Sequence, residues 1–192
     1  MNLLRLASSF IVAAGVLASS AALAAEPEDT LILKLKDGEV SIALRPDLAP
    51  KHVEQIKALT RAGEYNNVAF HRVIEGFMAQ TGDVQYGDLE DGYSSQRAGT
   101  GGSALGNIPA EFTKEPFERG TLGMARSSNP DSANSQFFIM FAPASHLNGS
   151  YTVVGKVESG MEVVDKIKRG NQSNNGSVTD PDRIISARIA AD

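Results

Sequence analysis

Short stretches of alternating hydrophobic and polar residues recur along most of the chain. Residues 30–36 form the first stretch, and residues 39–44 alternate as its return strand after Asp37-Gly38, a dipeptide typical of a type I′ hairpin turn. Further stretches of strand length and hydrophobic character cover residues 68–74, 77–80, 122–125, 136–141, 151–157 and 184–189. The pattern predicts a protein built mainly from short β-strands.

Only two segments have the spacing expected of helices. In residues 50–61, Val53, Ile56 and Leu59 recur every three residues and fall on one face, and Gly63 suits the C-terminal cap. Residues 161–168 fit a second helix. Many strands with two helices favour an antiparallel barrel or sandwich. The long polar stretch 82–106, rich in Gly, Ser and Asp, is typical of a functional loop.

The first 24 residues have a different character. Arg5 precedes the hydrophobic stretch 6–17, and Ala22-Leu23-Ala24 has the small residues of a signal-peptide cleavage site. The alternative is an uncleaved membrane anchor, but the stretch is short and acidic residues follow it. We therefore expect a signal peptide over residues 1–24, a single domain over residues 25–192, export to the periplasm, and no stable membrane insertion after cleavage.

Charge and composition exclude several classes of function. The net charge is -5 and no run of Lys or Arg occurs, which argues against nucleic-acid binding. The chain has no cysteine, so disulfides, thiol catalysis and cysteine-ligated zinc are excluded. His52, His71 and His146 lack the spacing of metal ligands, and we expect neither a metal nor a cofactor.

The run from Phe70 to Asp83 reads FHRVIEGFMAQTGD and closely resembles the FHR-x-I-x-GFM-x-Q-x-GD signature of the cyclophilins. Further motifs of that family follow in its order: Gly99-Thr100-Gly101-Gly102, residues 122–125, residues 135–139, Leu147-Asn148-Gly149 and residues 154–157. The resemblance spans residues 31–190. It implies a bacterial exported cyclophilin with a closed eight-stranded antiparallel barrel, capped by two α-helices, and an active groove on the outside of the barrel.

The resemblance implies a peptidyl-prolyl cis-trans isomerase that assists the folding of exported proteins. Rotation about a peptide bond has a barrier of roughly 18–20 kcal/mol, and X-Pro bonds exchange over tens to hundreds of seconds. A fixed donor beside the proline nitrogen favours the twisted state, in which that nitrogen regains its lone pair. Arg72 is the expected catalytic residue, because its guanidinium is a rigid, permanently charged donor. A salt-bridged strand arginine is the alternative for Arg72.

The resemblance also implies a substrate site. Its expected residues are Phe77, Met78, Phe138 and Leu147 in a proline pocket, Gln80 and Gln136 holding the substrate backbone, and Ala125 and Arg126 giving main-chain contacts on the opposite wall. His146 and Tyr151 are also expected to bind the substrate. Phe137 alternates with Phe138 and is expected in the core. His71 is expected to be a structural residue with its hydrogen bonds satisfied, since the reaction moves no proton.

Two positions depart from the family pattern. The best-known members have tryptophan where this chain has His146, and often histidine where it has Tyr151, so we expect weak cyclosporin binding. The stretch between Asp83 and Gly99 is also longer and acidic. The expected partners are proline-containing polypeptides, and the expected state is a monomer. A module that binds proline-containing segments without turnover is the main alternative; a hydrolase is less well supported, because no G-x-S-x-G motif occurs.

Overall fold

In the computed structural model, which describes residues 25–192, eight strands form one antiparallel sheet in the order β3-β4-β6-β5-β7-β2-β1-β8. The strands are β1 Thr30–Leu35, β2 Gly38–Leu44, β3 Arg72–Ile74, β4 Met78–Thr81, β5 Thr121–Met124, β6 Phe137–Met140, β7 Val153–Ser159 and β8 Ser186–Ile189. The α-helices are α1 Pro50–Arg61 and α2 Met161–Val164. The predicted signal peptide lies outside the described residues.

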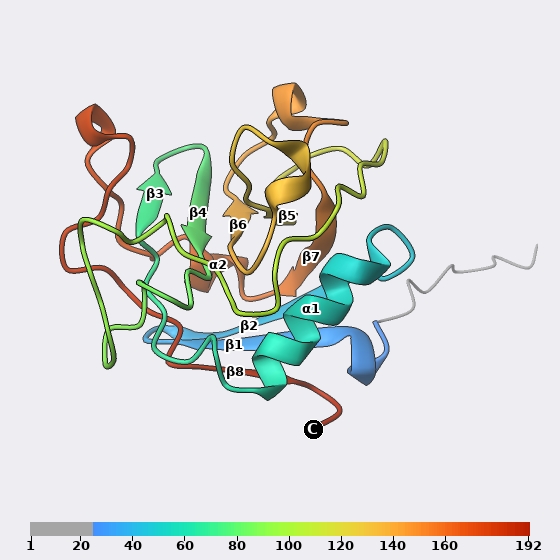
Figure 1. The fold of residues 1–192 in the computed structure, drawn as a ribbon, viewed down its shortest axis with the longest axis horizontal. Helices are drawn as coiled ribbons and strands as arrows, with labels where there is room; N and C mark the ends of the chain where they lie inside the picture. Colours follow the sequence, from blue (N-terminus) through green and yellow to red (C-terminus); the bar gives the residue numbers. More distant parts are fainter. Residues whose placement is uncertain (1–24) are drawn as a thin grey trace, which may run out of the picture.

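The sheet curls around the core. Figure 1 shows β4, β6, β5 and β7 in a row across the upper half of the view, while β2, β1 and β8 run across the lower half, where α1 crosses them. The edge strands β3 and β8 do not pair with each other; instead, an isolated bridge joins Ala69 to Arg183, and the Phe70 amide donates to the Asp182 carbonyl at 2.8 Å. The predicted fold class, eight antiparallel strands with two helices, is confirmed, but the sheet is a curled half-barrel and no ladder closes it between β3 and β8.

Several predicted elements are shorter than expected, and the difference is largest in two of them. The stretch 68–74 contributes a strand only at Arg72–Ile74, because the amide of Ala69 donates to Gly87 in the long loop instead of to a neighbouring strand. The second helix ends at Val164, since the amides of Lys166 and Ile167 bond to carbonyls three residues back and tighten the last turn.

The first hairpin does not have the predicted type I′ turn. Leu35 pairs with Gly38, so Lys36 and Asp37 are the two loop residues. A type I′ turn needs a positive φ at both central residues, whereas in this hairpin only Gly38 has one, at 146°. That prediction was wrong, because the glycine opens the return strand instead of completing the turn.

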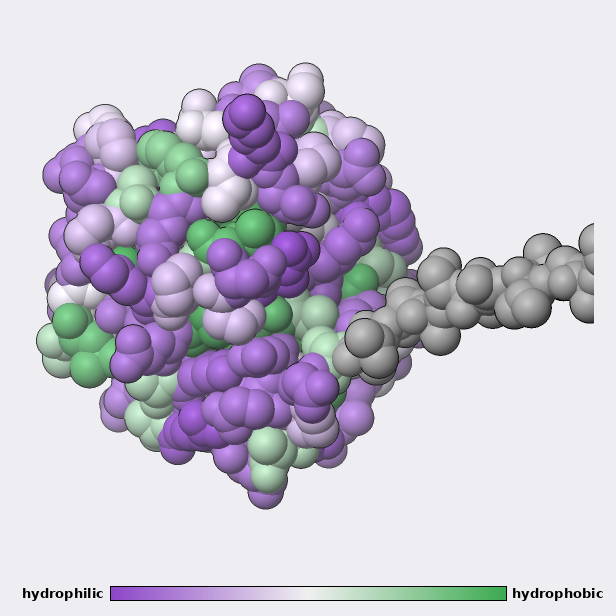
Figure 2. All heavy atoms as spheres, turned by 90° about the vertical axis from the view of Figure 1, so that its right-hand side faces the viewer, coloured by the Kyte–Doolittle hydropathy of each residue, from purple (hydrophilic) through white to green (hydrophobic). Residues whose placement is uncertain are grey.

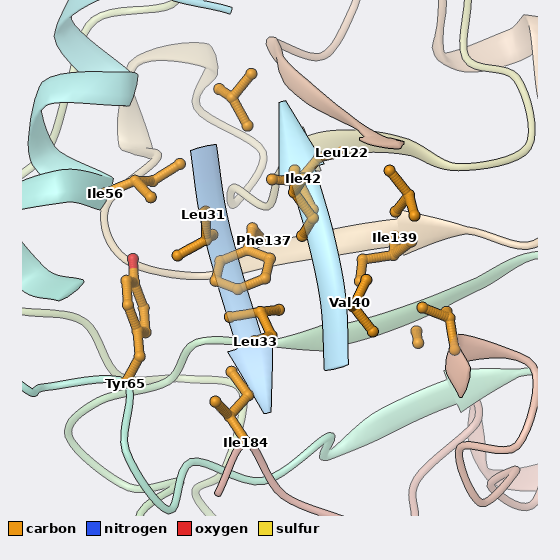
Figure 3. Packing of buried hydrophobic residues seen from close by; sticks show 14 of the residues in the cluster. Leu31, Leu33, Val40, Ile42, Ile56, Tyr65, Leu122, Phe137, Ile139 and Ile184 are labelled. Carbon is orange, nitrogen blue, oxygen red and sulfur yellow. The ribbon is translucent and has the colours of Figure 1, made fainter. Parts of the chain in front are cut away.

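Alternation along the strands gives the sheet two hydrophobic faces. Figure 3 shows Leu31, Leu33, Val40 and Ile42 of the first hairpin pointing toward Phe137 in the main core. The neighbouring residues of β6, Phe138 and Met140, belong to a second cluster on the outer face of the sheet, as a period of two requires. The prediction that Phe137 packs in the core is confirmed. Three residues of this second cluster, Met78, Phe138 and Leu147, form the floor of the groove described below.

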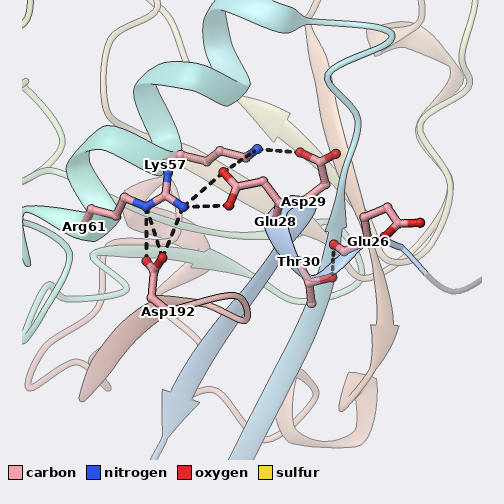
Figure 4. A network of polar contacts seen from close by, with 7 residues as sticks. All are labelled: Glu26, Glu28, Asp29, Thr30, Lys57, Arg61 and Asp192. Carbon is pink, nitrogen blue, oxygen red and sulfur yellow. Dashed lines mark hydrogen bonds and ion pairs between the residues drawn. The ribbon is translucent and has the colours of Figure 1, made fainter.

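Ion pairs join both ends of the described chain to α1 (Figure 4). Arg61 Nη2 lies 2.8 Å from Glu28 Oε2, and Arg61 Nε lies 3.1 Å from Asp192 Oδ2. Lys57 Nζ lies 2.5 Å from Asp29 Oδ1. The two Arg61 pairs are largely exposed and therefore contribute little stability each, whereas the Lys57–Asp29 pair is partly buried; together they fix the two ends beside the helix.

The surface seen in Figure 2 is mainly hydrophilic, with hydrophobic residues in small separate patches. Within residues 25–192, no helix is long and apolar enough to cross a membrane.

Candidate active site

A hollow of about 320 Å³ opens on the outer face of the sheet, over β4, β5 and β6. Its lining consists of Arg72, Phe77, Met78, Gln80, Ala125, Arg126, Phe138, His146, Leu147 and Tyr151. A second hollow, of about 390 Å³, shares the wall formed by Gln80, Ala125 and Arg126 and adds Gln136. The structure therefore brings together every residue expected at the site, in one continuous groove; their individual roles remain predictions.

The floor of the first hollow is apolar, and its side chains are packed against one another. Phe138 is buried and stacks against Phe117 with ring centroids 5.7 Å apart, and the Tyr151 ring meets it edge-on at 6.0 Å. Met78 and Leu147 are also buried. Aromatic and thioether groups packed in this way offer a flat surface that suits a small apolar ring.

The rim above this floor is more exposed. His146 is exposed and stacks on Phe77, with centroids 5.7 Å apart. The position that carries tryptophan in the best-known cyclophilins thus holds a smaller, polar ring over the same side of the hollow.

Arg72 lies at the edge of the hollow and is held by neutral groups. Its Nε donates to the Asn175 carbonyl at 3.0 Å, its Nη2 donates to Asn175 Oδ1 at 3.0 Å, and its Nη1 donates to Gln80 Oε1 at 3.2 Å. A guanidinium has five N–H donors, so these three bonds leave two for a ligand.

The charge on Arg72 has no counter-ion in the part of the chain that the structure describes. Burial lowers the pKa of this guanidinium from its ordinary value, while the nearby Tyr151 acts in the opposite direction. A guanidinium still stays protonated at neutral pH, because its unperturbed pKa is so high. The alternative of a salt-bridged strand arginine does not describe this side chain.

A chain of hydrogen bonds runs from Arg72 along the groove. Gln80 Nε2 donates to Gln136 Oε1 at 3.0 Å, and Gln136 Nε2 donates to the Gly101 carbonyl at 2.8 Å. In each glutamine the side-chain oxygen accepts a hydrogen bond on the side of Arg72, and the nitrogen donates one on the other side. The orientation of one amide therefore fixes the orientation of the next. The glutamines are therefore oriented before any ligand arrives.

The chain ends at Gly101, whose amide donates to Asp83, the residue that organises the long loop. This carboxylate is fully buried and accepts four backbone N–H groups, from Gln85, Tyr86, Gly99 and Gly101, at 2.7–3.1 Å. A Cβ added at Gly101 would lie 2.4 Å from Asp83 Oδ1. The backbone of Gly101 lies so close to the carboxylate that a side chain would not fit, which explains this glycine of the GTGG motif. The four hydrogen bonds to Asp83 also give the long loop a defined structure.

The wall formed by Ala125 and Arg126 differs from the expectation in one respect. The amide of Ala125 donates to the Gln136 carbonyl at 2.9 Å and is not available to a ligand. The Arg126 side chain is fixed instead: Nη2 lies 2.8 Å from the Ser150 carbonyl, and its guanidinium carbon lies 4.4 Å from the centre of the Tyr151 ring. Arg126 therefore adds a charged side chain to the groove as well as its main chain.

The expectation that the hydrogen bonds of His71 are satisfied was wrong. His71 is buried, as expected of a structural residue, but neither ring nitrogen has a hydrogen-bond partner among the described residues. Burial lowers the pKa of the imidazole, although the Asp83 carboxylate acts against this shift. The ring packs against Gly99, where an added Cβ would lie 3.0 Å from it.

Sequence reasoning missed Asn175 and the role of Asp83. Asn175 has a left-handed φ of 50°, and the pair Asn175-Gly176 could have marked it as a special backbone position. Its contact with Arg72 spans 103 residues of sequence, and no local pattern reveals it. No group of three or more His, Cys, Asp or Glu in residues 25–192 could hold a metal ion.

Comparisons with known proteins identify the family of the chain. Residues 30–189 match the family described as cyclophilin type peptidyl-prolyl cis-trans isomerase/CLD. A probable peptidyl-prolyl cis-trans isomerase of Brucella suis is 64% identical over 187 residues, which cover 97% of this chain and 95% of the relative. A peptidyl-prolyl cis-trans isomerase of Acinetobacter baylyi is 37% identical over 189 residues, which cover 93% of each chain.

Solved structures show the same fold. A cyclophilin from Hirschia baltica superposes with a TM-score of 0.73 at 25% identity, covering 88% of this chain and 76% of that one. A cyclophilin-type isomerase of Cryptosporidium parvum, crystallised in the presence of the dipeptide Ala-Pro, gives a TM-score of 0.71 at 26% identity, covering 83% and 98%. The family match, these relatives and the shared fold establish that the chain belongs to the cyclophilin-type peptidyl-prolyl cis-trans isomerases.

Proposed function

We propose that the groove accelerates rotation about X-Pro bonds with Arg72 as its catalytic residue. The observation that carries this proposal is the guanidinium at the edge of an apolar hollow, held by Gln80 and Asn175 and without a counter-ion among the described residues. The Cryptosporidium parvum relative was crystallised in the presence of Ala-Pro, which supports a proline-containing ligand for this groove.

The proposed mechanism needs no bond to be made or broken. The proline ring packs on Phe138, Met78 and Leu147, which removes it from water. As the peptide bond twists, resonance is lost and the proline nitrogen regains a lone pair. A free N–H of Arg72 then donates to that nitrogen, an interaction present only in the twisted state, and it therefore lowers the barrier.

The preceding residue is held while the bond rotates. Gln80 and Gln136 are fixed by the hydrogen-bond chain from Arg72 to Gly101, so their positions do not have to be reorganised during the reaction. A module that only binds proline would need the apolar floor but would gain nothing from an oriented, uncompensated guanidinium. The site therefore supports turnover over simple binding.

Exchange NMR on a short X-Pro peptide separates these two functions. The isomerase predicts cross-peaks between the cis and trans resonances whose rate rises in proportion to protein concentration. A binding module would shift and broaden the peptide resonances without raising the exchange rate. That second result would replace catalysis by binding as the function of the groove.

We also propose that the substrates are exported proteins folding in the periplasm. Support comes from the sequence, in which Ala22-Leu23-Ala24 follows a short hydrophobic stretch. N-terminal sequencing of the protein recovered from periplasmic extracts should begin at Ala25. A chain that begins at Met1 and remains in the cytoplasm would contradict export and leave the isomerase activity intact.

A further inference from the structure

We infer that the groove selects proline-containing segments that carry an acidic residue next to the proline or one position before that, and that Arg126 is the residue responsible. This inference rests on the proposed function, since it concerns the substrates of the same groove.

The first observation is the charge of the lining. The two adjoining hollows are lined by two arginines, Arg72 and Arg126, and no residue given for either lining within residues 25–192 is Asp or Glu. The chain as a whole is acidic, with a net charge of -5. The groove is therefore locally positive on a protein that is otherwise negative, and this contrast favours acidic segments at short range.

The second observation is that the Arg126 guanidinium is held in a fixed position without a carboxylate partner among the described residues. Its Nε and Nη2 donate to the Ser150 carbonyl at 3.3 and 2.8 Å, and its Nη1 donates to the Ser127 carbonyl at 2.8 Å. All three bonds go to neutral carbonyls, and Arg126 forms no ion pair with the carboxylates of the described chain. Its guanidinium also lies over the Tyr151 ring.

The third observation is where this charge lies. Arg126 belongs to the wall shared by the two hollows, and Tyr151 beneath it also lines the hollow with the apolar floor. A peptide whose proline occupies that floor and whose chain continues into the second hollow passes along this wall. A carboxylate on a residue flanking the proline can then reach the guanidinium, which has two N–H donors left after its three bonds.

Arg72 contributes to the same field but cannot by itself set this preference. It acts on the peptide bond at the centre of every substrate, whereas Arg126 lies on the shared wall and meets side chains that differ between substrates. Arg126 is thus a specificity-determining residue. A basic flanking residue should be disfavoured for the same electrostatic reason.

The test measures kcat/KM by exchange NMR, which needs no coupling protease, on three peptides that differ only in having Glu, Gln or Lys before the proline. Two further pairs of peptides compare Glu with Gln at other positions. In one pair the varied residue lies two positions before the proline, and in the other it lies directly after the proline. In at least one of these positions, Glu should exceed Gln by about two- to fivefold, the size of a partly exposed ion pair. The advantage should shrink on going from low salt to about 0.5 M salt, because exposed charges are screened.

Variants assign the preference to its residue. Arg126→Gln should abolish the Glu advantage, and Arg126→Lys should restore part of it, since the charge returns without the planar fork. Arg188→Gln, on the exposed outer position of β8, removes the same charge away from the groove and should leave the ratio unchanged. Equal rates for Glu and Gln peptides at every position, or an advantage that persists in Arg126→Gln, would overturn the inference. If no peptide is turned over at all, the proposed function itself fails instead.

Discussion

Asn175 shows how a single residue distant in sequence can control the groove. Its carbonyl and its side-chain oxygen each accept an N–H of Arg72, and its backbone has a left-handed φ of 50°. Glycine tolerates this φ without strain, so Asn175→Gly removes the side-chain contact and keeps the backbone one.

We expect Asn175→Gly to lower kcat/KM about tenfold, equivalent to roughly 1.4 kcal/mol, because Arg72 loses a fixed orientation. The loss should fall on kcat more than on KM, since the apolar floor is untouched. Asn174→Gly, at the exposed neighbouring position, is the matched control. Wild-type kcat in Asn175→Gly would show that Arg72 does not depend on this asparagine.

His146 provides a second test at the scale of one side chain. It is exposed and stacks on Phe77 at the rim, where the best-known cyclophilins carry tryptophan. We expect weak cyclosporin binding by the wild-type protein and tighter binding by His146→Trp, because indole adds apolar area and one N–H donor. Calorimetric titration of both proteins measures the difference. Equal affinities would mean that this position does not govern sensitivity.

At the scale of elements, the long loop depends on one buried carboxylate. Asp83 accepts four backbone N–H groups, and one of them belongs to Gly101. The carbonyl of Gly101 is the last acceptor in the hydrogen-bond chain from Arg72. We expect Asp83→Ala to lower the free energy of unfolding by about 2–4 kcal/mol, because buried donors lose a charged acceptor. Urea denaturation measures this loss.

Asp88 offers a matched control in the same loop. It accepts the amides of Glu90 and Asp91 in an exposed turn, so Asp88→Ala should cost less than about 1 kcal/mol. If Asp83→Ala unfolds at the same urea concentration as Asp88→Ala, the loop has another anchor.

The sequence predicted the strands and helices better than their ends. Alternation in β6 was sufficient to separate Phe137 from Phe138, since a strand has only two faces. The start of β3 was missed because Ala69 bonds to the distant Gly87, and hydrophobicity alone does not reveal a backbone partner. The family motifs identified the residues of the groove. They did not reveal that Asn175 and Asp83 hold these residues in place, because both act through contacts with segments that are distant in the sequence.

At the scale of the whole molecule, His71 links stability to pH. Burial lowers its pKa from the ordinary value of 6.5. The unfolded chain therefore takes up a proton at higher pH than the folded protein does, so His71 favours folding above pH 6.5 and this contribution is lost as the pH falls below that value.

Urea denaturation between about pH 7.5 and about pH 5.5 should show decreasing stability, with His71 contributing a slope of at most about 1.4 kcal/mol per pH unit. His71→Gln should flatten this slope, although its absolute stability will also differ. An unchanged slope in the variant would assign the pH dependence to other groups.

The central claim is that Arg72 stabilises the twisted peptide bond, and turnover measured beside binding tests it most directly. By exchange NMR on one X-Pro peptide, Arg72→Ala should lose about two to three orders of magnitude in kcat/KM, roughly 3–4 kcal/mol, while the peptide Kd changes far less. Arg72→Lys should recover little, because an ammonium lacks the planar fork. Thermal melting of both variants should stay near that of the wild type, since Arg72 is only half-buried. Wild-type turnover in Arg72→Ala, or a loss explained entirely by unfolding, would contradict the account.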